Sequence, residues 1–101
     1  MDTSIDIAEM ARYFQTALLF NVPPSLKRLS FSCESKDIKV LAVFSAEPKD
    51  YEQDCVFATV AEVEGHYVSV KVIAECRTEV AESPIADLSN LVFARYEANI
   101  Y

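Results

Sequence analysis

Few residues of this chain have side chains suited to catalysis or metal binding, and they lie far apart in the sequence. His66 is the only histidine, and the three cysteines are Cys33, Cys55 and Cys76. A metal site needs ligands clustered at short intervals, and no cysteine stands at such an interval from His66. Cysteine catalysis would require a thiolate beside His66, and nearby carboxylates in a chain this acidic disfavour the thiolate. The residues predict neither a metal nor a cofactor, and they favour buried free thiols in a reducing cytoplasm.

Paired carboxylates that act as general acid and base are the remaining catalytic chemistry to weigh, because the chain has sixteen acids. Asp54 and Glu62, two turns apart on a predicted helix, would point into solvent rather than into a cleft. Phosphate-binding loops need several glycines, and Gly65 is the only one. The sequence therefore predicts that the protein is not an enzyme. A small hydrolase that uses Cys55 or a carboxylate pair stays as a less favoured alternative.

The formal net charge of −7 lies in the second half of the chain. Residues 1–44 hold five acids and five bases, whereas residues 45–101 hold eleven acids and four bases. The densest stretch, residues 47–64, has six acids against Lys49 alone. A field of one sign speeds and orients encounter with a partner of opposite sign. The same field repels phosphates, so we expect no nucleic-acid partner.

The spacing of apolar residues predicts a helix over residues 48–64, and this helix would carry the acidic stretch. Val56, Val60, Val63 and Tyr67 recur at helical intervals, with Phe57 beside them. Pro48 suits a first helical turn, and Gly65 suits a helix end. The opposite face becomes the candidate binding surface for a basic partner, since Tyr anchors interfaces and carboxylates pair with Lys and Arg. Its candidate residues are Asp50, Tyr51, Asp54 and Glu62, with Glu52 at the margin.

The rest of the chain predicts one further helix and four strands. Apolar residues from Ile7 to Leu18 form a stripe within a helix over residues 4–20, capped by Thr3 or Ser4 and ended by Asn21 and two prolines. Alternation predicts a hairpin of two strands, a third strand after the second helix, and a fourth at the end. These strands cover residues 28–34, 38–44, 68–76 and 91–97, and residues 77–90 connect the last two.

The order α-β-β-α-β-β predicts an α+β fold of two layers, with two helices packed on one face of an antiparallel four-stranded sheet. At 101 residues the chain is expected to form a single domain over residues 1–101. Its apolar runs are too short to span a bilayer, and its first residues do not form a signal peptide. We therefore expect a cytoplasmic protein with no membrane partner.

Three segments of the chain resemble the small immunity proteins of bacterial polymorphic toxin systems, and most of all those of contact-dependent growth inhibition. Residues 17–27 are similar to the family's helix end, proline turn and basic strand start. Residues 38–64 are similar to its strand, Glu-Pro and acidic helix, and residues 83–85 with 91–97 to its closing strand of aromatic-x-Arg-x-Glu form. The chain departs from the pattern at Phe20, where the family often has Gly, and at Ser45, where it often has Asp.

This resemblance implies a cytoplasmic protein that binds a cognate toxin domain and blocks its active site or the approach of its substrate. Such toxins are frequently nucleases with basic surfaces, so the expected partner is the C-terminal domain of a nuclease toxin. The resemblance assigns no contact residue. A homodimeric regulatory or structural module is the alternative, because Leu41, Val43 and Ile73 would make the outer face of the sheet apolar.

Overall fold

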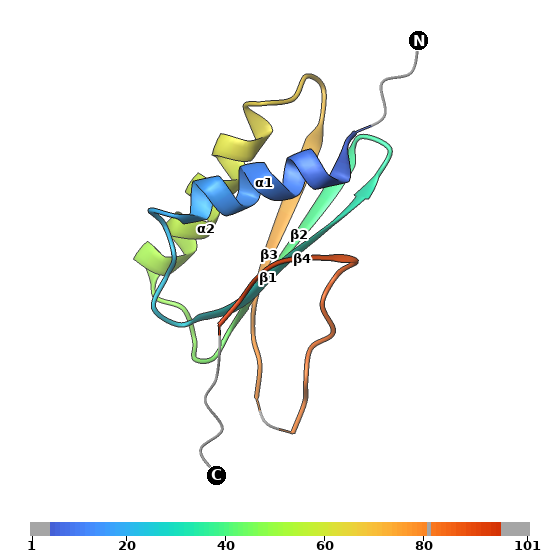
Figure 1. The fold of residues 1–101 in the computed structure, drawn as a ribbon. Coiled ribbons are helices and arrows are strands. Elements are labelled where there is room, and N and C mark those ends of the chain that lie inside the picture. Colours follow the sequence, from blue (N-terminus) through green and yellow to red (C-terminus); the bar gives the residue numbers. More distant parts are fainter. Residues whose placement is uncertain (1–4, 81, 96–101) are drawn as a thin grey trace.

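The computed structural model describes residues 5–80 and 82–95, which form two helices and a four-stranded sheet (Figure 1). The elements in chain order are α1 (Ile7–Leu18), β1 (Leu26–Glu34), β2 (Asp37–Phe44), α2 (Asp50–Glu64), β3 (Lys71–Thr78) and β4 (Asn90–Ala94). The predicted α+β class and the order of elements are confirmed. Neither helix within the described residues is long and apolar enough to cross a membrane.

Helix α1 begins one turn later than the sequence predicted. Asp6 is its N-cap, and the Asp6 carboxylate accepts hydrogen bonds from the backbone N–H groups of Ala8 and Glu9 at 3.0 and 3.2 Å. This carboxylate satisfies N–H groups that have no partner within the helix. Thr3 and Ser4, the caps expected from the sequence, lie outside the described residues.

Helix α2 also begins later than expected, at Asp50, with Lys49 as its N-cap. Pro48 precedes the helix, so its predicted place in the first turn was wrong. The predicted end is confirmed, because α2 stops at Glu64 and Gly65 is its C-cap.

The sheet is mixed, and the prediction of a fully antiparallel sheet was wrong. Its strand order is β3-β2-β1-β4, in which β1 pairs antiparallel with β2 and β4 while β2 pairs parallel with β3. The reason is the connection between β2 and β3. Since α2 carries the chain back along the sheet, β3 starts at the same end as β2 and runs in the same direction.

Strand β3 lies further along the chain than predicted, ending at Thr78 rather than at residue 76, and β4 ends earlier than predicted. β3 begins at Lys71 rather than at residue 68, and Ser69 just before it has a left-handed backbone with φ of 63°. That conformation interrupts an extended strand. β4 covers Asn90–Ala94, and the predicted strand residues Tyr96 and Glu97 lie outside the described part of the chain.

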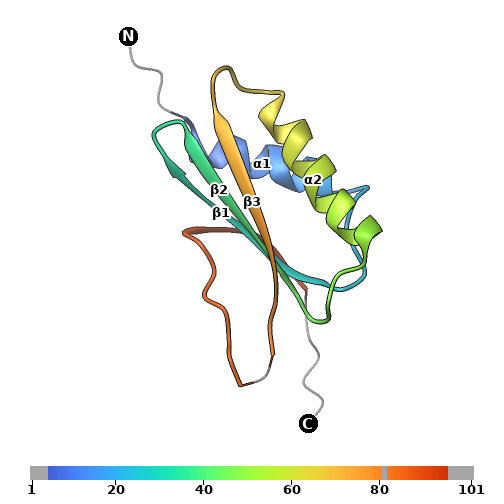
Figure 2. The ribbon, with the colours of Figure 1, turned by 180° about the vertical axis from the view of Figure 1, so that it is seen from behind.

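One hydrophobic core joins both helices to the sheet, and Figures 1 and 2 show α1 and α2 on the same side of it. Helix α1 contributes Met10 and Phe14, and the Phe14 ring stacks on Phe31 of β1 with a centroid distance of 5.0 Å. The remaining buried apolar members from the other elements include Leu26, Leu29, Ile38, Val40, Ala42, Phe44, Val56, Val60 and Val63.

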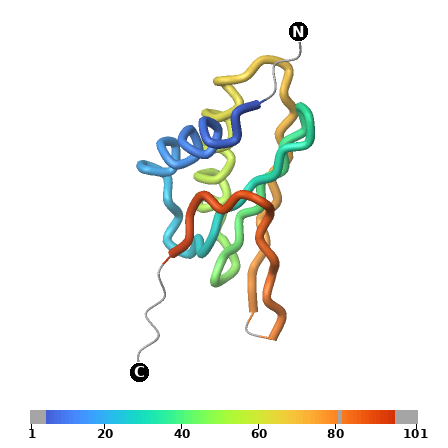
Figure 3. The backbone as a smooth tube through the Cα atoms, turned by 45° about the vertical axis from the view of Figure 1, so that its right-hand side comes forward, coloured from blue at the N-terminus to red at the C-terminus, as the bar shows by residue number. Residues whose placement is uncertain are grey.

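The connection between β3 and β4 packs on the other face of the sheet; Figure 3 traces it in orange and red. The backbone N–H of Leu88 donates to the Ser30 hydroxyl at 2.9 Å, and both Leu41 and Val43 are buried. Of the three residues predicted to make this face apolar and exposed, only Ile73 is accessible, at 54%. The prediction was therefore wrong for Leu41 and Val43, because residues far along the chain cover them.

Candidate functional site

The candidate site is the solvent-facing side of α2, which we call the acidic face. Four of the five residues nominated from the sequence are on it, namely Asp50, Tyr51, Asp54 and Glu62, and all four are exposed. The Tyr51 side chain is 54% accessible. Phe57, Ala58 and Ala61 complete the acidic face.

The acidic face exists because the opposite side of α2 has to be buried. Val56, Val60 and Val63 recur every three or four residues and join the core. Thr59 lies among them, and its hydroxyl donates to the Cys55 carbonyl oxygen at 2.9 Å, so it is buried without an unsatisfied polar group. Core packing thus holds α2 in one orientation and directs its acids to solvent.

Within the part of the chain that the structure describes, no ion pair involves the acids of this face. Among the ion pairs of the described residues, Lys27 and Arg28 pair with Glu79, Arg28 also pairs with Asp87, and Arg77 pairs with Glu75. None of these bases reaches Asp50, Asp54 or Glu62. Their negative charge is available to a basic partner.

Glu52 is the nominated residue that does not belong to the acidic face. It is 3% exposed, and its carboxylate accepts hydrogen bonds from the Ser25 hydroxyl at 2.5 Å, the Ser25 N–H at 2.9 Å and the Lys49 N–H at 3.1 Å. These bonds, the Ser25 hydroxyl first, lower the pKa of Glu52. The carboxylate ties the start of α2 to the segment before β1, which is a structural role.

Phe57 is a functional candidate that the sequence reasoning missed. Its spacing placed it beside the buried stripe, yet its side chain is 48% exposed. It lies on the flank of the acidic face opposite to Tyr51, about 120° away around the helix axis at 3.6 residues per turn. Two accessible aromatic rings therefore border the small residues Ala58 and Ala61, an arrangement suited to anchoring a partner.

The arrangement of α2 disfavours the hydrolase alternative. Cys55 lies nine residues before the end of α2 at Glu64, about 14 Å at about 1.5 Å per helical residue, and His66 lies beyond that end. Asp54 and Glu62 are about 12 Å apart by the same rise, with both side chains exposed. Neither pair is within reach of a shared proton. Among the described residues no group of three or more His, Cys, Asp or Glu is placed to hold a metal ion.

The other two cysteines are poor nucleophiles for a different reason. Burial raises the pKa of the Cys33 thiol and of the Cys76 thiol, and Glu75 raises that of Cys76 further. The Cys33 thiol donates to the carbonyl oxygen of Ser35 at 3.3 Å. Since the thiolate is the reactive form, both thiols are suited to packing rather than to attack.

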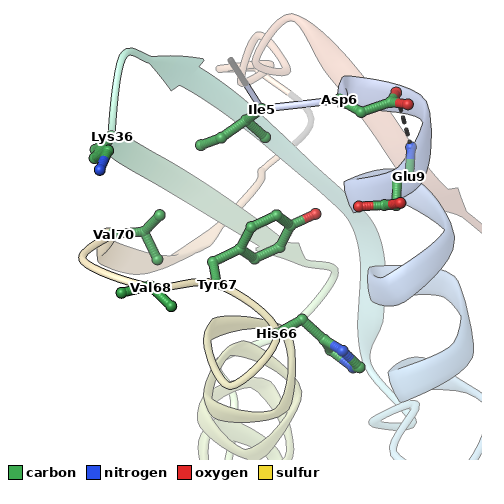
Figure 4. Close-up of a pocket in the computed structure, with 8 residues that line it drawn as sticks. All are labelled: Ile5, Asp6, Glu9, Lys36, His66, Tyr67, Val68 and Val70. Carbon is green, nitrogen blue, oxygen red and sulfur yellow. Dashed lines mark hydrogen bonds between the residues drawn. The ribbon is translucent and has the colours of Figure 1, made fainter. Parts of the chain in front are cut away.

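A cavity of about 530 Å³ lies where the start of α1 meets the end of α2 and the turn between β1 and β2 (Figure 4). Figure 4 shows the Tyr67 ring below Ile5, with its hydroxyl directed toward the start of α1, where Asp6 and Glu9 lie. The complete lining is Ile5, Asp6, Glu9, Lys36, His66, Tyr67, Val68 and Val70. Sequence reasoning missed this cavity because three separate elements form it.

The polar groups of this cavity are not arranged for catalysis. Burial raises the pKa of Tyr67 to about 12, with Glu9 adding to the shift, so its hydroxyl stays protonated at neutral pH and is no general base. That hydroxyl is buried and has no hydrogen-bond partner within the described residues. The His66 ring is stacked on Tyr13 with centroids 3.8 Å apart, and Tyr13 meets Tyr67 edge to face. These contacts join the two helices.

An ion-pair network holds the connection after β3 in place. The sequence carries no local signal for it, because its members lie tens of positions apart. Glu79 accepts from Lys27 at 2.7 Å and from two guanidinium nitrogens of Arg28 at 3.2 and 2.7 Å, and also from the Ile85 N–H at 2.8 Å. Arg28 donates further to Asp87 at 2.8 Å and to the Ile85 carbonyl at 2.9 Å. Lys27 and Arg28, the two bases of β1, therefore pair with residues of this connection within the same molecule.

Comparison with protein-family models identifies an immunity protein family. The model of the MafI2 immunity protein family matches residues 7–97, which include every helix and strand described above. A search of the curated proteins finds no match to this chain.

Proposed function

This chain belongs to the MafI2 immunity protein family, and from that membership we propose that it neutralises its cognate toxin by direct binding through the acidic face of α2. The family match supports an immunity protein of a polymorphic toxin system, a non-enzymatic role, and a toxin as the partner. The resemblance recognised in the sequence is therefore confirmed at the level of the immunity protein.

The observation that carries the choice of surface is the combination of exposed acids and exposed aromatics on one rigid helix. Asp50, Asp54 and Glu62 have no internal counter-ion in the described structure, while Tyr51 and Phe57 are about half accessible. Aromatic residues are enriched at interface centres, and charges around them steer and orient the partner. Buried valines hold the helix in place, so little order has to be gained on binding.

The partner that this face fits is the basic C-terminal domain of a nuclease toxin. A nuclease binds phosphates through Lys and Arg, and the carboxylates of α2 would occupy the same positive surface. The immunity protein then excludes substrate by occupying the basic cleft rather than by any chemistry of its own. An interface of standard size would take about 800 Å² from each partner. Neutralisation of this kind takes place in the cytoplasm, where the nucleic acid is.

Charge reversal on the acidic face tests the proposal. We expect Asp54→Lys with Glu62→Lys to weaken binding to the purified cognate toxin domain by about 100-fold or more, because each reversal replaces an attraction of about 1 kcal/mol with a repulsion. The association rate of the unaltered protein should also fall as salt rises, since the attraction is screened. Surface plasmon resonance at two ionic strengths measures both quantities.

The matched control reverses two exposed acids elsewhere, Glu34→Lys with Glu82→Lys. Each double variant raises the formal net charge by four, from −7 to −3, so both lose the same overall attraction. Both variants should therefore associate more slowly than the unaltered protein. Only the α2 variant should also dissociate faster, and so lose more affinity than its slower association explains. Equal affinities for the two variants would place the contact on another surface. Nuclease assays of the toxin domain with added immunity protein report whether substrate is excluded.

A further inference from the structure

Among the described residues no strand pairs with the outer edge of β3, and we propose that a strand of the toxin pairs with it, extending the sheet. This inference rests on the proposed function for the identity of the partner, and it concerns a different surface from the acidic face. In Figure 2, β3 lies in front with α2 beside it, and α2 contacts β3. A toxin bound to the acidic face would therefore be close to this edge.

Two hydrogen bonds establish which backbone groups of β3 point outward. The Lys71 N–H donates to the Lys36 carbonyl and the Glu79 N–H donates to the Phe44 carbonyl, both at 2.9 Å. Backbone groups alternate in direction along a strand, so the odd-numbered residues from 71 to 79 bond β2. The N–H and C=O groups of Val72, Ala74, Cys76 and Thr78 then point away from the sheet, and β3 has no other neighbouring strand among the described residues.

The two edges of this sheet differ in how they are protected against pairing. β4, at one edge, has five residues and an irregular register with β1. β3, at the other, has eight residues, no proline or glycine, and eight consecutive pairs with β2 without a bulge. Short strands, prolines and bulges are the common protections of edge strands. The only protection of this kind on β3 is the set of charged side chains on the face of the sheet away from the helices, and such charges can also select a partner. They are Lys71, Glu75 and Arg77.

Burial along β3 shows that the core is incomplete on this side. Val72, Ala74 and Cys76 face the core but remain partly exposed, whereas the matching positions of β2 are buried. A strand added beyond β3 would cover these three side chains. Strand addition of this kind combines main-chain hydrogen bonds with side-chain pairing.

Charge favours the toxin over a second copy as the added strand. A twofold pairing of β3 with itself would bring two α2 helices near one another, each with unneutralised acids, and two chains of net charge −7 repel. A basic toxin is attracted to the same side. The added strand would best match the charged side chains on this face of β3 with opposite charges. It would place an acid beside Lys71, a base beside Glu75 and an acid beside Arg77.

Amide hydrogen exchange of the immunity protein, alone and with the toxin domain, tests the inference. In the free protein the amides of Val72, Ala74, Cys76 and Thr78 should exchange quickly, and those of the three intervening residues slowly. In the complex the four outward amides should slow by about 100-fold or more. If the complex forms and these four rates stay unchanged, the inference is wrong while the proposed function stands. If no complex forms, the proposed function itself fails.

A proline substitution gives an independent measurement. Ala74→Pro removes an outward N–H and no bond to β2, and its control Ala74→Val keeps that N–H. We expect the proline variant to bind the toxin at least about tenfold more weakly than the valine variant. Equal affinities of two folded variants would overturn the inference. Slowed exchange of the outward amides in the free protein at high concentration, with a dimer in sedimentation, would identify a second copy instead.

Discussion

Arg28→Met is the substitution that most directly tests how the connection after β3 is held. The guanidinium donates to Glu79, to Asp87 and to the Ile85 carbonyl, and the side chain is only 18% exposed. Hydrogen bonds to Glu79 first, and then to Asp87, raise the pKa of Arg28, so the group is charged throughout the accessible range. Methionine keeps much of the apolar stem and removes all four donor contacts.

The expected loss is about 2–3 kcal/mol of unfolding free energy. Hydrogen bonds to charged groups are worth about 1.5–3 kcal/mol each, and removal of one member of a buried pair costs about 3–5 kcal/mol. The value here is lower because the side chain is partly accessible and Glu79 keeps Lys27 and the Ile85 N–H as partners. For a domain of this size the loss corresponds to about 10–15 °C in Tm.

The assay is thermal unfolding followed by circular dichroism, with urea unfolding as the second measurement. Arg77→Met is the matched control, because Arg77 is 53% exposed and its single ion pair with Glu75 spans 3.9 Å. That control should change stability by less than about 0.5 kcal/mol. Amide exchange of Leu88, whose N–H donates to Ser30, reports whether the connection itself has loosened.

Equal Tm values for the two methionine variants would refute the reasoning, because they would show that the buried network stabilises no more than an exposed pair. An Arg28→Met variant that is less stable but leaves the Leu88 amide protected would also contradict it. In that case the loss would come from β1 itself rather than from the connection.

Three further predictions follow from single side chains. Hydrogen bonds, first from Arg28, lower the pKa of Glu79 in the folded state. The stabilisation that Glu79 provides is therefore complete above the ordinary carboxyl pKa of 4.5 and is lost as the pH falls below that value. Glu79→Gln should flatten the acid limb of a curve of Tm against pH. Glu52→Gln should lower Tm yet leave toxin affinity unchanged in calorimetric titration, because the carboxylate is buried between the first turn of α2 and Ser25. Tyr67→Phe should leave Tm equal or raise it, since the buried hydroxyl has no hydrogen-bond partner in the described structure.

Periodicity in the sequence was enough to identify both helices and the buried side of α2. The stripe of Val56, Val60 and Val63 is a local signal, because residues three or four apart on a helix share a face whatever else the fold does. The same rule placed Asp50, Tyr51, Asp54 and Glu62 in solvent, where they are. It failed for Glu52, whose burial depends on Ser25, a residue 27 positions earlier.

Helix boundaries and the direction of β3 were less accessible to sequence reasoning. The first turn of each helix is decided by which group satisfies the free N–H groups at its start, and the carboxylates of Asp6 and Glu52 do so here. Strand direction depends on where the connection re-enters the sheet, and alternation within residues 71–78 is the same for a parallel and an antiparallel strand.

The sequence by itself determined the class of the fold, the acidic face of α2 and the likeness to immunity proteins, because each depends on local spacing or on short segments. Only the tertiary structure decided the mixed sheet, the burial of Leu41 and Val43, the Arg28–Glu79 network and the open edge of β3. Each of these joins residues tens of positions apart or depends on which strands become neighbours. Such pairings are fixed when the whole core packs, and no single segment carries a signal for them.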